Sequence, residues 1–266
     1  MLLTFIYNQL SSTPNCLVLG MKLYLDSTSY IETQDFIDLS IGVSSQGVQA
    51  WYLDPPKFTP VMENGFVGSI ALGGGVNFRN IQFNPHGHGT HTESYGHIAH
   101  EIFPVSSCFK EYLFHAKLIS IEPEVDGQDR IITAARLSEV LSGGAVEALI
   151  LRTLPNEIDK LNMQYSNTNP PFMELACVEV LNNFGVQHLL VDIPSVDKEV
   201  DGGALAFHHA FWQVPENPIA HKTITELIFV PNHLTDGDYL LELQVANFEN
   251  DAAPSRPLLY PIKKEA

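Results

Sequence analysis

The feature that most constrains the fold is an alternation of apolar runs and helix-like segments between residues 116 and 192. Residues 132–144 predict a helix that ends at glycines, and residues 170–185 predict a second helix with proline at its start and Gly185 as its C-cap. Strand–helix–strand alternation is typical of α/β proteins with a largely buried sheet, which is the fold class we expect. The apolar runs that predict buried strands are residues 116–123, 145–153 and 186–192.

Both flanks of this region indicate β structure. Short apolar runs broken by glycine and proline fill residues 36–83, and the triplet Gly73 to Gly75 lacks the spacing of a phosphate loop, so we expect a turn or bulge there. In the tail, residues 223–230 and 239–247 flank the turn residues Asp236 to Asp238 and predict a hairpin. No linker-like run separates these parts, so residues 21–266 are expected to form one domain.

The charge of the chain excludes several classes of partner. Fourteen Lys and Arg residues oppose 31 Asp and Glu residues, which gives a net charge of −17 at pH 7. Such a chain lacks the cations that neutralise phosphates, so neither nucleic acid nor a membrane surface is an expected partner. The three cysteines form no C-x-x-C pair and favour a reduced, cytoplasmic location. No apolar stretch reaches the roughly 18 residues of a membrane span.

The first twenty residues differ from the rest because they carry no charged side chain. A secretory signal needs basic residues before its apolar run and small residues at a cleavage site, and neither is present. We therefore expect residues 1–20 to be an N-terminal extension ahead of a natural start at Met21. The alternative is an extra strand or a weak targeting segment.

Histidine is concentrated in one short window, where even spreading would place only about 0.6 of a residue. Glu93 lies two residues after His91, so in an extended strand both side chains leave the same face and can bind one cation. Imidazole and carboxylate without a thiolate suit Zn²⁺, Mn²⁺ or Fe²⁺. The alternative is a surface tract with only adventitious metal affinity. The five histidines of the window are His86, His88, His91, His97 and His100.

The segment from Gly89 to His97, with the sequence GTHTESYGH, resembles the motif His-x-Gly-Thr-His-x-Asp-x-Pro-x-His. That motif belongs to the cyclase family of metal-dependent hydrolases, which includes bacterial kynurenine formamidases and isatin hydrolases. Gly87 stands where the family has its first His, Glu93 replaces Asp, and Tyr95 replaces Pro. Either His86 or His88 could supply the missing ligand. We favour His86, because the residues PHG precede the motif as a turn.

The resemblance continues downstream in family order, from about residue 35 to the end of the chain. Residues 192–197, DIPSVD, follow a predicted strand and resemble the family's Asp-Thr-Pro-Ser segment. His208 and Glu226 are similar to its later metal ligands, with residues 211–225 as an inserted loop between them. His209 is the alternative to His208, but adjacent helical residues do not share a face. The resemblance thus implies metal ligation by His86, His91, Glu93, His208 and Glu226, and a general acid/base role for His97.

The resemblance also implies a swivelling β/β/α fold with a central mixed, barrel-like sheet flanked by helices. It implies one or two divalent ions per subunit, Zn or Mn, with Glu93 where the family's Asp can bridge two metals. The expected activity is hydrolysis of a C–N bond in an aryl formamide, cyclic amide or related small molecule, by a homodimer or higher homo-oligomer. The alternative is a catalytically silent protein that binds metal or a small molecule on the same scaffold.

Overall fold

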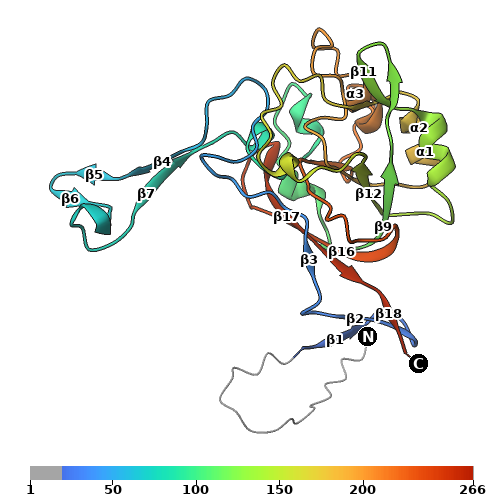
Figure 1. Ribbon diagram of the computed structural model, residues 1–266, viewed down its shortest axis with the longest axis horizontal. Coiled ribbons are helices and arrows are strands. Elements are labelled where there is room, and N and C mark those ends of the chain that lie inside the picture. Colours follow the sequence, from blue (N-terminus) through green and yellow to red (C-terminus); the bar gives the residue numbers. More distant parts are fainter. Residues whose placement is uncertain (1–19, 266) are drawn as a thin grey trace.

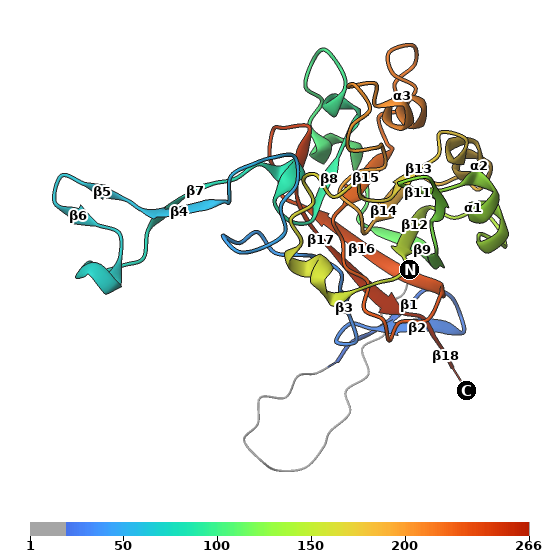
Figure 2. The ribbon, with the colours of Figure 1, turned by 45° about the horizontal axis from the view of Figure 1, so that its top comes forward.

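A closed sheet of seven strands forms the centre of the computed structural model, which describes residues 20–265 (Figures 1 and 2). Strand β16 pairs with both β9 and β17, which closes the ring into a barrel, and β3 (Ile37–Asp38) adds to the outside of β17. In order around the barrel the strands are β16 (Gly237–Val245), β9 (Leu113–Ile121), β12 (Ala148–Thr153), β14 (His188–Val191), β15 (Thr223–Glu226), β8 (His91–Glu93) and β17 (Ala252–Pro261).

The four strands from β9 to β15 are parallel, and the other neighbours in the ring are antiparallel. Parallel strands are buried on both faces, which explains why every residue of β12 is buried. With a period of two along β12, Leu149 and Leu151 pack toward the helices, whereas Ala148 and Ile150 pack on the opposite face. The helices are α1 (Ala134–Val140), α2 (Cys177–Asn183) and α3 (Ala206–Trp212).

The predicted α/β class with a mixed barrel-like sheet is confirmed, and two local predictions are wrong. The second helix begins at Cys177, because the preceding residues form β13 (Phe172–Met173), which pairs with β11 (Asp129–Ile132). Proline at 170 and 171 favours this extended backbone rather than a helix start. The tail hairpin does not join β15 to β16: β15 lies between β14 and β8, and the hairpin is β16 with β17.

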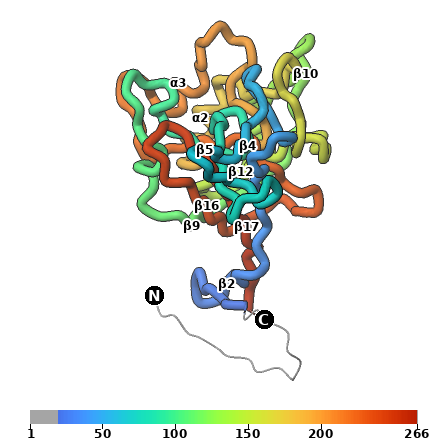
Figure 3. Tube along the Cα trace, turned by 90° about the vertical axis from the view of Figure 1, so that its left-hand side faces the viewer, coloured from blue at the N-terminus to red at the C-terminus, as the bar shows by residue number. Residues whose placement is uncertain are grey.

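A two-stranded arm, residues 57–82, projects from the barrel (Figure 1) and points toward the viewer in Figure 3. In it β4 (Lys57–Pro60) pairs with β7 (Arg79–Gln82), and β5 (Met62–Glu63) pairs with β6 (Phe66–Val67). The short helix η1 (Ile70–Leu72) follows, and Gly73 ends it with a φ of +89°. The triplet at Gly73 is thus a turn, as the sequence predicts.

Two small sheets complete the described part of the chain. One contains β1 (Lys22–Tyr24), β2 (Ser29–Glu32) and β18 (Lys263–Lys264), and the other adds β10 (Glu124–Asp126) to β11 and β13. Among residues 20–265, no helix is long and apolar enough to cross a membrane. The extension predicted for residues 1–20 lies outside the described residues, apart from its last position.

Candidate metal centre

Strand β8 places an imidazole and a carboxyl group inside the molecule. It lies between β15 and β17, so that His91 stands opposite Glu226 on one side and Pro254 on the other. The exposed fractions of His91 and Glu93 are 0% and 1%. A buried charged side chain is unfavourable unless other groups pair with it, so the surroundings of these two residues decide what the strand can do. The surface-tract interpretation of the histidine window does not fit this burial.

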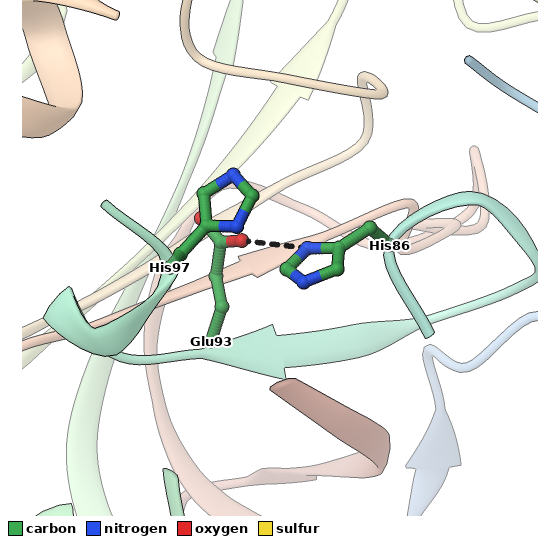
Figure 4. Close-up of side chains that lie close together, drawn as sticks. All are labelled: His86, Glu93 and His97. Atoms are coloured by element: carbon green, nitrogen blue, oxygen red, sulfur yellow. Dashed lines mark ion pairs between the residues drawn. The ribbon is translucent and has the colours of Figure 1, made fainter. Parts of the chain in front are cut away.

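Glu93 is the centre of the group. Its Oε2 lies 3.0 Å from Nδ1 of His86, and its Oε1 lies 3.0 Å from Nε2 of His208. Figure 4 shows the ring of His97 beside the same carboxylate. Burial alone would raise the pKa of the Glu93 carboxyl, but the three neighbouring imidazoles hold it well below its ordinary value. Carboxylates and imidazoles in contact are groups that commonly bind divalent metals.

His91 supplies the clearest sign that a ligand belongs here. Its Nδ1 lies 3.2 Å from the carbonyl oxygen of Gly89, so with the proton on Nδ1 the lone pair of Nε2 is free. This buried Nε2 has no hydrogen-bond partner and lies 3.5 Å from Oε2 of Glu226. Glu226 is held in place by the Val196 N–H, which donates to its Oε1 over 3.2 Å. A buried lone pair directed at a carboxylate fits a bound cation, and the residues present therefore fit a metal.

Two aspartates orient the imidazoles from behind. Oδ2 of Asp197 lies 2.6 Å from Nδ1 of His208, and Oδ2 of Asp251 lies 2.8 Å from Nε2 of His86. Each imidazole thus turns its other nitrogen to Glu93, as in the carboxylate–histidine–metal arrangement of many metal sites. Burial lowers the pKa of His86 and His208, but the surrounding carboxylates outweigh it and raise both to about 10.

His97 stands at the open side of the group. It ends the short helix η3 (Tyr95–His97), which Ser94 caps by accepting the N–H of Gly96. Its Nδ1 lies 3.5 Å from Oδ2 of Asp251, its ring centroid lies 4.2 Å from that of His86, and 29% of its side chain is exposed. It is the most accessible imidazole of the group, and therefore suited to contact a small molecule.

All six residues predicted for the site meet in one place, and the two alternatives lie elsewhere. His88 accepts the N–H of Asn84 at its Nδ1 over 2.9 Å, and so braces η2 (Pro85–Gly87), the turn that carries His86. His209 directs its Nδ1 to the carbonyl oxygen of Val214, 3.0 Å away. His208 and His209 are neighbours on α3, where successive side chains point in different directions, so the two histidines face different surroundings.

Sequence reasoning missed the roles of Asp197 and Asp251. Asp197 closes the segment DIPSVD, and its carboxylate also accepts the backbone N–H groups of Phe207 and His208 at the start of α3. Asp251 has no local signal, because it lies 154 positions after His97 and approaches it only where β17 pairs with β8. Among the described residues, two sets have ligand atoms within 4.8 Å of one another: His86, Glu93 and His97, and His91, Glu93 and Glu226.

Known proteins resemble this chain over most of its length. The family model Cyclase matches residues 37–198. The kynurenine formamidase of Bacillus thuringiensis is 26% identical over 246 residues, which cover 87% of this chain and all of that protein. The kynurenine formamidase of Bacillus cytotoxicus is 32% identical over 118 residues, 44% of this chain, so that the matched part spans only 51% of that relative.

Solved structures share the fold at lower identity. Isatin hydrolase A from Labrenzia aggregata superposes with a TM-score of 0.59 and 14% identity, covering 85% of this chain and 93% of its own. A protein described as a predicted metal-dependent hydrolase, from Bacillus stearothermophilus, superposes with a TM-score of 0.57 and 14% identity, covering 85% of this chain and 97% of its own. The barrel, including the strands that carry the metal centre, is thus an arrangement found in other proteins.

Proposed function

This chain belongs to the cyclase family, and we propose that it is a metal-dependent amidohydrolase that cleaves a C–N bond of an aryl formamide, cyclic amide or related small molecule. The observation that carries the proposal is the buried, unpartnered Nε2 of His91, which faces Glu226 inside a ring of imidazoles and carboxylates. The names of the relatives support amide hydrolysis as the reaction.

The proposed ligands are the five residues whose free atoms point inward. His86 would bind through Nδ1, and His91 and His208 through Nε2, with Glu93 and Glu226 as the carboxylates. The absence of a thiolate in this set supports Zn²⁺ or Mn²⁺, one or two ions per subunit. Such an ion, when bound, activates water and polarises an amide carbonyl.

The proposed acid/base is His97. With the proton of Nδ1 directed at Asp251, Nε2 is left to accept a proton from the attacking water and to pass it to the leaving nitrogen. Asp251 contacts both His97 and His86, so it fixes the acid/base relative to the ligands. His97 pairs with no other carboxylate among the ion pairs of the described residues, and 29% of its side chain is exposed, so its Nε2 is left to contact substrate.

The test is metal analysis of protein purified without a histidine tag, combined with hydrolysis assays on N-formylkynurenine, isatin and simple aryl formamides. The proposal expects stoichiometric metal and turnover that falls at least about 100-fold in His97→Ala while the metal stays bound. His100→Ala, which changes an exposed histidine three residues away, is the matched control.

The outcomes separate the competing functions. Stoichiometric metal without turnover on these amides would favour the catalytically silent binding protein. Protein that retains no metal would overturn the site itself. A cytoplasmic location is part of the proposal, and the free, buried thiols of Cys108 and Cys177 support a reducing compartment.

A further inference from the structure

A small hollow lies among the segments that hold the metal centre. It contains about 150 Å³ of empty space, less than the roughly 300–1,000 Å³ of pockets that take whole ligands, so only one group of a ligand can enter it. The lining residues are Ala50, Trp51, Tyr165, Pro170, Pro194 and Glu199. Aromatic rings of this kind recognise organic ammonium ions, and a carboxylate beside them adds the opposite charge.

The walls of the hollow are fixed to each other and to the metal centre. The Tyr165 N–H donates to the carbonyl oxygen of Gln49 over 2.8 Å, which joins the two segments that carry the aromatic rings. The Trp51 indole N–H donates to the carbonyl oxygen of His86 over 3.1 Å. Pro194 belongs to the segment DIPSVD, which also orients two of the proposed metal ligands. A molecule with one group in the hollow therefore lies beside the metal centre.

The backbone at Trp51 and Tyr52 is strained. Their φ angles are +60° and +58°, in the left-handed region that bulky residues rarely occupy. The Tyr52 N–H donates to Oγ of Ser166 over 2.8 Å, and its hydroxyl donates to Oε1 of Glu199 over 3.0 Å, so both ends of the residue are held. Strain of this kind persists where the surrounding structure enforces it, and it is concentrated at functional sites. The strain therefore indicates that the position of the Trp51 ring serves a function.

The carboxylate of Glu199 is fixed in place but has no cationic partner. Its Oε1 accepts the N–H of Asn167 over 2.6 Å, and its Oε2 accepts the N–H of Asn169 over 3.1 Å. These neutral donors orient the carboxylate without compensating its charge. Its neighbour Lys198 pairs with Asp129 over 2.6 Å, and no Lys, Arg or His among residues 20–265 forms an ion pair with Glu199. An ammonium ion in the hollow would supply the missing partner through a charge-assisted hydrogen bond or direct attraction.

We propose that the hollow binds an ammonium group of the substrate, so that the amide cleaved at the metal centre carries an amino or alkylammonium substituent. This inference rests on the proposed amide hydrolysis at that centre. The rings of Trp51 and Tyr165 offer cation–π contacts, and Glu199 supplies the opposite charge. The net charge of −17 also attracts cations to the chain. An uncharged group of the same shape gains none of these interactions, so charge is the basis of selection.

Isothermal titration calorimetry with tetramethylammonium tests the hollow without using activity, and tert-butanol is the uncharged probe of similar size. The unchanged chain is expected to bind the cation at least about tenfold more tightly than the alcohol. Glu199→Gln should lose this preference. The matched control Glu157→Gln removes the same charge from an exposed glutamate outside the hollow and should keep it. No binding of the cation, equal affinity for both probes, or an unaffected Glu199→Gln would overturn the proposal.

Fluorinated tryptophan at position 51 gives a second readout, which a loosened loop in Glu199→Gln could not produce. Each fluorine withdraws electrons from the face of the ring and so weakens its attraction for a cation. The affinity for tetramethylammonium should therefore fall stepwise as the number of fluorines on Trp51 increases, while the fold and the hydrogen bond to His86 are retained. The same affinity across the series would overturn the proposal.

Kinetics separate this inference from the proposed function. Formanilide with a 3-(trimethylammonio)methyl substituent and its uncharged 3-neopentyl analogue have the same shape and the same amide. The cationic substrate is expected to have a KM at least about tenfold lower, and the difference should disappear in Glu199→Gln. Hydrolysis of both with equal KM would overturn the ammonium site and leave the amidohydrolase standing. Binding of tetramethylammonium without hydrolysis of either amide would contradict the amidohydrolase and leave the ammonium site standing.

Discussion

The metal centre and the arm both depart from the usual distribution of side chains, in which charged groups are exposed and apolar groups are buried. The centre buries charged groups, with Glu93 1% exposed, whereas the arm exposes apolar ones, with Leu72 63% exposed. In the centre the charges compensate one another, because the imidazoles of His86 and His208 each lie between two carboxylates. In the arm nothing among the described residues covers the apolar side chains. The centre should thus respond to small changes of charge or volume that the exposed arm tolerates.

The largest expected effect comes from removing the charge at the middle of the centre. Glu93→Gln leaves His86 and His208 facing a neutral amide, so the bound metal should be lost and hydrolysis should fall by about 10³ or more. Metal analysis and the amide assays measure both. The same substitution in the arm, Glu63→Gln, should change neither. If Glu93→Gln kept full metal and activity, the centre would not depend on its charge.

Two glycines with the same backbone conformation sharpen the contrast. Gly89 beside the centre has a φ of +91° and Gly73 in the arm has +89°. A Cβ at Gly89 would lie 2.6 Å from the carbonyl oxygen of Ile41, whereas nothing lies within 4 Å of one at Gly73. Gly89→Ala should therefore lower the free energy of unfolding by about 3 kcal/mol, and Gly73→Ala by at most about 1 kcal/mol. Urea unfolding measures both, and equal losses would contradict this difference in packing.

Asp251 tests whether the centre depends on groups beyond its ligands. Asp251→Asn retains an acceptor for His86 but removes the charge. Metal affinity or activity should therefore fall by about 10- to 100-fold. Competition with a chelator gives the affinity. Asp238→Asn, an exposed aspartate on β16, is the control and should behave like the unchanged chain. If Asp251→Asn left metal affinity and activity unchanged, the centre would depend on its direct ligands alone.

The smallest expected effect is a loss of stability at acidic pH. Burial lowers the pKa of His188 to about 4, against 6.5 in the unfolded chain, so the unfolded state binds more protons between these values and stability falls as the pH decreases. Between pH 7 and pH 5 the free energy of unfolding should fall by about 2 kcal/mol for this reason. Urea unfolding of the unchanged chain and of His188→Gln at both pH values should show that difference. The arm contains no histidine, so a pH effect confined to the arm would contradict this prediction.

The parts of the fold that follow from local pattern could be predicted. The buried strand β12, the helix α1 before it and the shared face of His91 and Glu93 all depend on residues close in sequence. The wrong hairpin shows the limit, because turn residues separate β15 from β16, yet β15 pairs with β14 and β8, which come from distant parts of the chain. The second helix begins later than the pattern predicts, because Phe172 and Met173 pair with β11 as a strand.

The same limit explains which site residues the sequence reveals. His86, His91, Glu93 and His97 lie within twelve residues, so their density is visible without a structure. Asp251 approaches them only through the pairing of β17 with β8. The projection of the arm was also hidden, because apolar runs in a surface arm and in core strands have the same pattern. Only the position of the arm outside the barrel separates the two cases.

The position of β8 also determines when during synthesis the centre can form. The chain grows from its N-terminus, and β8 emerges early, yet both of its neighbours, β15 and β17, are among the last strands to be made. His208, Glu226 and Asp251 reach the ribosome exit long after His91. A nascent chain that stops before Ala252 holds the histidine window and β15 but lacks β17, the strand on the other side of β8. The proposed metal site therefore requires β17, and loss of residues 252–266 should abolish metal binding as loss of a ligand would.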